Sequence, residues 1–252
     1  MRYLVLTSFL LFLLALPAAA QVGPAASRAE RHGYSLGIGV HNIQSCWTPN
    51  DYEVARNRMY FEGSYGFTEH LEGFARAGVS DWVVNDIETY KPGMVRDIST
   101  DGSPPGFVSG GLRGEMWRFG RFSVGGSAEA AWYCGMDRFV RWNYDVYQEL
   151  LFDSTFELTA AVPVGCDLGR SVVYGGPLLH FGYSRLNVRT HKFDVDWEVE
   201  DTIHALTIRD KGGVGGFLGW RTPLGKKGWN LQLEAAGMRG GFAGSLGFYR
   251  GW

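Results

Sequence analysis

The chain has 252 residues, of which 36 are glycine and 15% are aromatic, and its mean hydropathy is -0.12. This length allows one large or two small domains, and the high aromatic content with only 9 prolines excludes a disordered Pro/Gly tract. The 24 Lys and Arg residues against 26 Asp and Glu residues give a formal charge of -2. That balance excludes the broad basic field of a nucleic-acid-binding protein and the acidic excess of a solvating tail, so no nucleic-acid partner is expected.

Residues 1–20 have the pattern of a secretory signal peptide. Arg2 gives a short positive start, an apolar run follows to Leu16, and the small residues before Gln21 form an A-x-A cleavage site. The apolar run is too short for a membrane-spanning helix, and no later stretch approaches the roughly 18 apolar residues that such a helix needs. We therefore expect an exported chain that begins at Gln21.

Residues 21–33 form a polar lead-in, and from Tyr34 onward apolar residues alternate with polar or small ones. A period of two is typical of half-buried β-strands. We predict ten such segments, at 34–42, 58–67, 71–80, 107–117, 121–133, 150–162, 171–185, 206–221, 229–238 and 242–252. The seventh and eighth segments are irregular, which leaves counts of eight or twelve strands open. Proline cannot donate to a strand ladder, so we expect a bulge or local disruption at Pro177.

Two architectures produce this alternation, a soluble β-sandwich and a transmembrane β-barrel. The connections distinguish them, because short turns alternate with long connections at 43–57, 85–106, 135–147 and 187–204. In an up-and-down barrel this order places every short turn at one rim and nearly every long loop at the other. The exception is the last hairpin, whose turn near Gly240 is short. We predict an all-β fold over 34–252, a transmembrane up-and-down antiparallel barrel of about ten strands.

The last segment ends in an aromatic residue and carries apolar residues at alternate positions. This row consists of Phe242, Leu246, Phe248 and Trp252. With the leader and the alternating segments, it makes the whole mature chain resemble small bacterial outer-membrane β-barrel proteins. The resemblance implies that barrel assembly machinery recognises the row as an insertion signal. It also implies a monomer in the outer membrane of a Gram-negative-type bacterium, in contact with lipid and lipopolysaccharide.

Ten charged residues would meet in the interior of such a barrel. They are Glu62, Glu72, Arg76, Arg113, Glu115, Glu129, Asp153, Glu157, Arg185 and Glu234. Charges away from bulk water persist when they are paired, so we favour a lumen filled by ion pairs over an ion-selective pore lining. Barrels of about eight strands are just filled by their side chains, and ten strands add little width, so an open diffusion pore is not expected.

Aromatic residues near the segment ends are expected to form girdles at the two membrane interfaces rather than ligand contacts. They are Tyr34, Phe67, Trp82, Trp117, Trp132, Trp220, Trp229 and Trp252.

The alternation of apolar and polar residues continues through 138–148 and 191–201, which predicts strands that project beyond the membrane. A change of parity there predicts a bulge near His204. The acidic row flanked by His191 and His204 suggests a divalent-cation site, but a solvated strand face is favoured because no fixed ligand spacing is present.

The residues give little support to catalysis. His41, His180, His191 and His204 lack a recognisable catalytic neighbourhood, and Ser184 follows His180 without a motif. We expect no enzyme activity, no cofactor and no metal. The leading hypothesis is a barrel with a structural or surface-loop binding role. A narrow porin-like channel is the first alternative, and an outer-membrane protease or lipid-modifying hydrolase is the second.

The chain contains three cysteines. In the predicted topology Cys46 and Cys134 lie at the long-loop rim, whereas Cys166 lies in a short turn at the opposite rim. A bridge between Cys46 and Cys134 is therefore the only disulfide that this topology allows, and an exported location permits it.

Overall fold

The computed structural model describes residues 22–24, 32–48, 52–85, 104–141, 146–194, 197–225 and 228–252. The signal peptide predicted at 1–20 lies outside them. Within these ranges every regular element is a β-strand, and no helix is long and apolar enough to cross a membrane. The strands are β1 Tyr34–Thr48, β2 Tyr52–Gly66, β3 Leu71–Asn85, β4 Gly106–Phe119, β5 Phe122–Tyr133, β6 Met136–Arg141, β7 Val146–Ala161, β8 Val164–Asp167, β9 Val172–Asp194, β10 Trp197–Asp210, β11 Gly213–Leu224, β12 Trp229–Met238 and β13 Gly241–Gly251.

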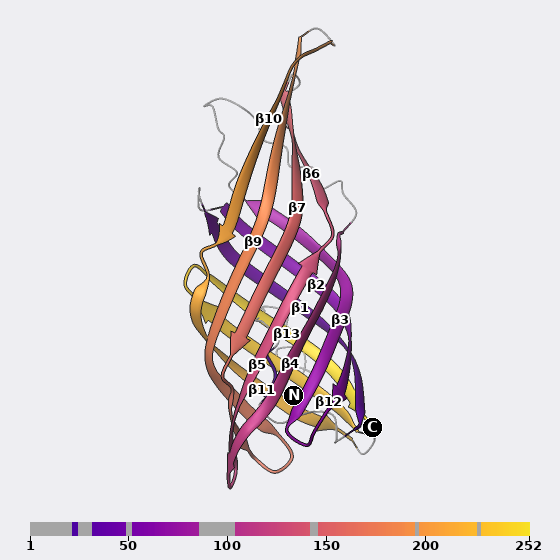
Figure 1. Cartoon of the computed structure of the whole chain (residues 1–252), viewed down its shortest axis with the longest axis vertical. Helices are drawn as coiled ribbons and strands as arrows, with labels where there is room; N and C mark the ends of the chain where they lie inside the picture. Colours follow the sequence, from indigo (N-terminus) through magenta and orange to yellow (C-terminus); the bar gives the residue numbers. More distant parts are fainter. Residues whose placement is uncertain are drawn as a thin grey trace, which may run out of the picture.

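The strands close into one antiparallel barrel (Figure 1). The order around it is β1-β2-β3-β4-β5-β7-β9-β11-β12-β13, and β13 pairs back with β1 from Ser35↔Gly251 to Ser45↔Gly241. Three further strands continue neighbours of the ring: β6 continues β5, β8 continues β7, and β10 leads into β11. This confirms the predicted all-β, ten-strand barrel.

The turns from β2 to β3, from β4 to β5 and from β8 to β9 lie at one rim, beside the chain's carboxyl end, whereas the short turn from β12 to β13 lies at the other rim, as predicted (Figure 1). Residues 67–70 and 120–121 form the first two of these turns, and backbone hydrogen bonds between Tyr34 and Trp252 hold the start of β1 beside the C-terminus. At the other rim β7, β9 and β10 extend well beyond the ring, as predicted (Figure 1). The strand β9 alone has 23 residues.

The connection predicted at 43–57 is wrong, because β1 and β2 remain paired from Asn42↔Asn57 to Trp47↔Tyr52. Only residues 49–51 lie between the two strands. The alternation was hidden because the outward positions Asn42 and Gln44 are polar, which removes the apolar outer row that marks the strand lower down.

The irregularities differ in part from those predicted. At Pro177 there is no register shift with β11, but the ladder on the other side is interrupted: β7 pairs with β9 up to Ala161↔Leu178 and β8 resumes at Val164↔Gly175. In β10 the register shifts between Glu198 and Glu200 rather than near His204. Another irregularity, in β7 between Asp153 and Phe156, was not predicted.

The outer surface of the ring carries large exposed apolar side chains on almost every strand. Examples are Leu36, Ile38, Val40, Met59, Phe61, Val79, Val108, Leu112, Trp132, Leu158, Leu179, Phe181, Val214, Leu218 and Phe248. Phe61 is 73% exposed. A continuous outward apolar belt with a polar interior is the pattern of a transmembrane barrel.

Inside the ring, small residues make room for aromatic rings on neighbouring strands. Gly219 on β11 pairs with Tyr174 on β9, and a Cβ atom at Gly219 would clash with the Tyr174 ring. Trp82, predicted to belong to an interfacial girdle, instead points inward and is 1% exposed. It packs in a lumen cluster with Trp47 and Phe152.

Candidate functional site in the barrel lumen

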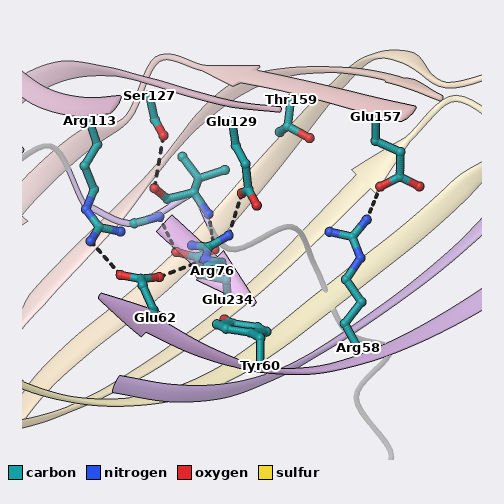
Figure 2. Close-up of polar contacts among 12 residues, drawn as sticks. Arg58, Tyr60, Glu62, Arg76, Arg113, Ser127, Glu129, Glu157, Thr159 and Glu234 are labelled. Atoms are coloured by element: carbon teal, nitrogen blue, oxygen red, sulfur yellow. Dashed lines mark hydrogen bonds and ion pairs between the residues drawn. The ribbon is translucent and has the colours of Figure 1, made fainter. Parts of the chain in front are cut away.

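A chain of buried ion pairs crosses the lumen from β2 to β5 (Figure 2). Arg76 Nε lies 2.8 Å from Glu62 Oε2, and an Arg76 terminal nitrogen lies 2.5 Å from Glu129. Arg113 meets the other Glu62 oxygen at 2.7 Å and also binds Glu72. Glu62 therefore joins two guanidinium groups, each of which meets a second carboxylate.

The strand register explains this network. Glu62 on β2 is directly opposite Arg76 on β3, and Glu72 on β3 is directly opposite Arg113 on β4. Opposite charges at cross-strand positions on one face stabilise a sheet. Because all these positions face the lumen, the pairs from three adjacent strands merge into one network.

Aromatic rings cover the two guanidinium groups. Arg76 lies 5.0 Å from the Tyr60 ring centroid and 4.7 Å from that of Phe74, and Arg113 lies 4.7 Å from the same Phe74 ring. These are cation–π distances. The charged layer is thus packed between side chains, as a structural network requires.

A second charged group lies nearer the long-loop rim. Glu157 on β7 binds both Arg56 and Arg58 on β2, and the Tyr133 hydroxyl donates to Glu157 at 2.8 Å. Asp210 lies 3.4 Å from Arg56. This group joins strands on opposite sides of the lumen.

An aromatic layer covers this second group. The Arg56 guanidinium lies 5.3 Å from the Trp47 ring and 5.4 Å from the Trp82 ring. Trp82 in turn contacts Tyr133 edge-to-face, with ring centroids 5.3 Å apart. The described part of the lumen nearer the long-loop rim is therefore occupied by large rings and paired charges.

Two of the ten predicted lumen charges point outward. Asp153 and Arg185 are opposite each other in the register of β7 and β9, but both are exposed on the outer surface. Glu115 lies near the short-turn rim, where its side chain is 4% exposed and pairs with Arg118 at 2.7 Å.

The two outward positions have separate causes. In β7 the bulge at Ser154, whose φ is +53°, inverts the parity, so that Phe152 and Thr155 both point inward and Asp153 points out. Arg185 lies at an odd position of β9, on the same outer face as Phe181.

Glu234 lies in the lumen and contacts a segment that precedes the barrel. Its carboxylate accepts hydrogen bonds from the Tyr174 hydroxyl and the Gln232 amide, each at 2.6 Å, and from the backbone N–H groups of Val22 and Gly23. Sequence reasoning assigned residues 21–33 only to a polar lead-in and gave no sign of this contact.

Among the candidate catalytic side chains that the structure describes, His180 lies between a hydroxyl and a carboxylate. His180 Nδ1 lies 2.9 Å from the Thr159 hydroxyl, and His180 Nε2 lies 3.4 Å from Asp210. His180 is 1% exposed and the Asp210 side chain is fully buried. His41 is also buried, and Ser184 shares a 2.6 Å hydrogen bond with Thr155.

His191 lies 3.9 Å from Glu149, and His204 is described only in its backbone. Among the side chains that the structure describes, no group of three His, Cys, Asp or Glu residues is placed to hold a metal ion. The acidic row between these two histidines falls on side chains outside the described set.

The predicted disulfide is wrong. Cys46, Cys134 and Cys166 are all free thiols. Cys46 belongs to β1 and Cys134 follows β5, so β2, β3 and β4 separate them around the ring. Sharing a rim was not enough to bring the two cysteines together.

Three charged residues of this site are absent from the ten predicted lumen charges: Arg56, Arg58 and Asp210. Arg56 falls in the segment predicted as a loop, and Asp210 carries no motif. Arg58 faces inward in the predicted second strand, and extending that alternation by two residues toward the N-terminus would have placed Arg56 on the same inward face.

Phe242, Phe248 and Trp252 are exposed on the outer face of the barrel end, and Leu246 is half-buried. Their role as an insertion signal stays a prediction.

No family model matches the chain, and neither does any curated protein. Among solved structures, it is similar to the translocator domain of autotransporter NalP from Neisseria meningitidis, with 11% identity, a TM-score of 0.45 and coverage of 87% of this chain and 88% of that one. It is also similar to outer membrane protease OmpT from Escherichia coli, with 6% identity, a TM-score of 0.41 and coverage of 86% and 94%. Ail, the attachment invasion locus protein of Yersinia pestis, is 9% identical, with a TM-score of 0.31 and coverage of 88% of this chain and 99% of that one. At these identities the likeness concerns the fold alone.

Proposed function

We propose that this chain is a monomeric, non-catalytic barrel of a Gram-negative-type outer membrane. In this proposal it does not conduct ions, and it holds the strands that project beyond the ring at the cell surface for a structural or binding role. The observation that carries the proposal is the filled lumen, in which Glu62, Arg76 and Arg113 form a buried network beneath an aromatic layer.

The outward belt supports the membrane location. Side chains such as Phe61 and Val214 expose more than two thirds of their surface, at 73% and 70%. Contiguous exposed apolar surface of this extent is rare on soluble proteins. A closed barrel also leaves no strand edge unpaired, which the hydrocarbon core of a membrane demands. Lipid and lipopolysaccharide are therefore the proposed contacts of the belt, and export with barrel assembly is the proposed route.

The lumen contents support a closed barrel. A conducting pore needs a continuous water-filled path lined by polar groups. Here Arg113 and Arg76 are nine-tenths or more buried and each is held by two carboxylates, while Trp47 and Trp82 occupy the lumen nearer the long-loop rim. A narrow channel would require these groups to separate.

Single-channel recording in planar bilayers tests the proposal. The wild-type barrel is expected to give no discrete openings. A Trp47→Ala, Trp82→Ala double variant is also expected to stay silent, because the paired Glu62, Arg76 and Arg113 side chains beneath these rings still fill the lumen. Trp132→Ala removes an outward ring and is the matched control for any change in the recording. Discrete openings of the wild-type protein would contradict a closed lumen and favour the channel alternative.

A further inference from the structure

Residues 22–24 lie inside the barrel, although they precede the first strand in the chain. Val22 is 3% exposed, and Gly23 and Pro24 are also buried. The Val22 side chain belongs to an apolar lumen cluster whose other members are Ile43, Ala161, Tyr174, Leu178, Phe217, Ala236 and Ala243. This cluster forms a pocket for one branched apolar side chain.

The backbone of the segment is held by polar side chains of the barrel wall. Glu234 Oε2 accepts the Val22 N–H and Glu234 Oε1 accepts the Gly23 N–H, each at 2.6 Å. On the other side of the lumen, the Ser127 hydroxyl donates to the Val22 carbonyl at 3.3 Å. Figure 2 shows Ser127 and Glu234 reaching toward this segment from different strands.

The carboxylate that receives the segment is itself fixed in place. The Tyr174 hydroxyl and the Gln232 amide both donate to Glu234 Oε1 at 2.6 Å. Glu234 is only 7% exposed. A buried carboxylate held by two barrel side chains is a prepared acceptor for two successive backbone N–H groups, an arrangement that binds anionic oxygen in many proteins.

The three residues match this site in sequence. Gly23 has a φ of +82°, a left-handed conformation that favours glycine. Pro24 has no backbone N–H, so its burial leaves no amide donor without an acceptor. Val22 supplies the branched side chain that the apolar pocket receives.

We propose that the lumen contains a peptide-binding site centred on Glu234, which is occupied in cis by Val22–Pro24. With the predicted cleavage before Gln21, Val22 is the second residue of the exported chain, so the site retains its amino-terminal end. The segment then fills the part of the lumen between Ser127 on β5 and Glu234 on β12. Docking follows removal of the leader, because the apolar leader would otherwise have to enter an already packed site.

Thiol labelling of the full chain tests this site. Val22→Cys is made in a background in which Cys46, Cys134 and Cys166 are replaced by serine, and the folded barrel is treated with a water-soluble maleimide. The rate is expected to be lower by at least about tenfold than in the same protein unfolded in urea, because a docked segment must open before it reacts. Equal rates in the two states would overturn the proposal.

Two further variants identify the groups that hold the segment. Glu234→Ala, added to the Val22→Cys protein, is expected to raise the labelling rate of the introduced thiol by about tenfold or more. Gly23→Val, which conflicts with the positive φ, is expected to do the same. Glu115→Ala is the matched control, since Glu115 pairs with Arg118 at the rim, and it should leave the protection unchanged.

Folding of each variant is checked by heat-modifiable migration on a gel, and Gly23→Val decides the matter if Glu234→Ala does not fold. Protection that survives loss of the carboxylate, or of Gly23, in a folded barrel would also overturn the proposal. Labelling does not depend on conductance, so a barrel that proves to conduct leaves this inference standing.

Discussion

Arg113→Met is expected to destabilise the barrel strongly. Arg113 is 1% exposed, and its guanidinium is held by Glu62 at 2.7 Å and by Glu72. Methionine keeps most of the apolar stem that packs beside Phe74 but removes the charge. The variant therefore isolates the electrostatic role of the side chain from its volume.

The magnitude follows from the surrounding charges. The network contains three carboxylates, of Glu62, Glu72 and Glu129, and two guanidiniums, of Arg76 and Arg113, so these five residues carry a formal charge of -1. Arg113→Met changes this to -2 and leaves the buried carboxylates of Glu62 and Glu72, which are 1% and 0% exposed, with one cation fewer. Removing one partner of a buried pair costs about 3–5 kcal/mol. We expect a loss in that range for the free energy of unfolding.

Equilibrium unfolding by guanidinium chloride in lipid vesicles, followed by tryptophan fluorescence, measures this loss. Arg185→Met on β9 is the matched control, because Arg185 and Asp153, opposite it on β7, are both exposed on the outer surface and the variant should lose less than about 1 kcal/mol. Adding Glu72→Gln to Arg113→Met should restore about 1–2 kcal/mol, since it removes a carboxylate left in excess. If the two Arg→Met variants differ by less than about 0.5 kcal/mol, the buried network does not stabilise the lumen and the reasoning fails.

Three further predictions concern the wall of the barrel. Gly219→Ala forces a methyl group into the Tyr174 ring and should lower the free energy of unfolding by about 1–3 kcal/mol in the same assay. Gly63→Ala is its control, because the added methyl group meets only an ordinary 3.7 Å contact and should change that free energy by less than about 1 kcal/mol. Equal losses in the two variants would refute the packing role of Gly219. Phe61→Lys in the middle of the outer belt should lower the free energy of unfolding in vesicles by about 2–4 kcal/mol, whereas Phe67→Lys at the rim should lower it by about 0–1 kcal/mol. A larger loss for Phe67→Lys would show that Phe61 does not lie at the centre of the lipid-facing belt. Alkylation of the unreduced, unfolded protein should modify all three cysteines, as measured by mass spectrometry. A pair of cysteines left unmodified would show that a disulfide does form.

Alternation of apolar and polar residues was enough to predict the barrel where its outer face meets an apolar environment. There, residues such as Ile38 and Phe61 contrast with inward Gly39 and Glu62, and the strands and their inward charges were found. Beyond the belt the outer face becomes polar while the lumen contains large rings, as at Asn42 and Trp47. The contrast then inverts, so a paired strand was predicted as a loop.

Single-residue bulges explain most of the remaining errors in the site. The bulge at Ser154 changes which face Asp153 and Phe152 occupy, and a strict period of two carries no sign of it. Contacts between distant strands, such as Arg56 with Asp210, depend on the closure of the ring rather than on local spacing. Docking of Val22 depends on a tertiary pocket that no local pattern encodes.

Fractionation of cells that express the full-length chain tests most directly whether the barrel spans the outer membrane. After an alkaline carbonate wash, the folded and heat-modifiable protein should remain with the outer-membrane fraction and enter solution only with detergent, because the belt that includes Phe61 contacts lipid. Recovery of the folded protein from the periplasm without detergent would contradict the account.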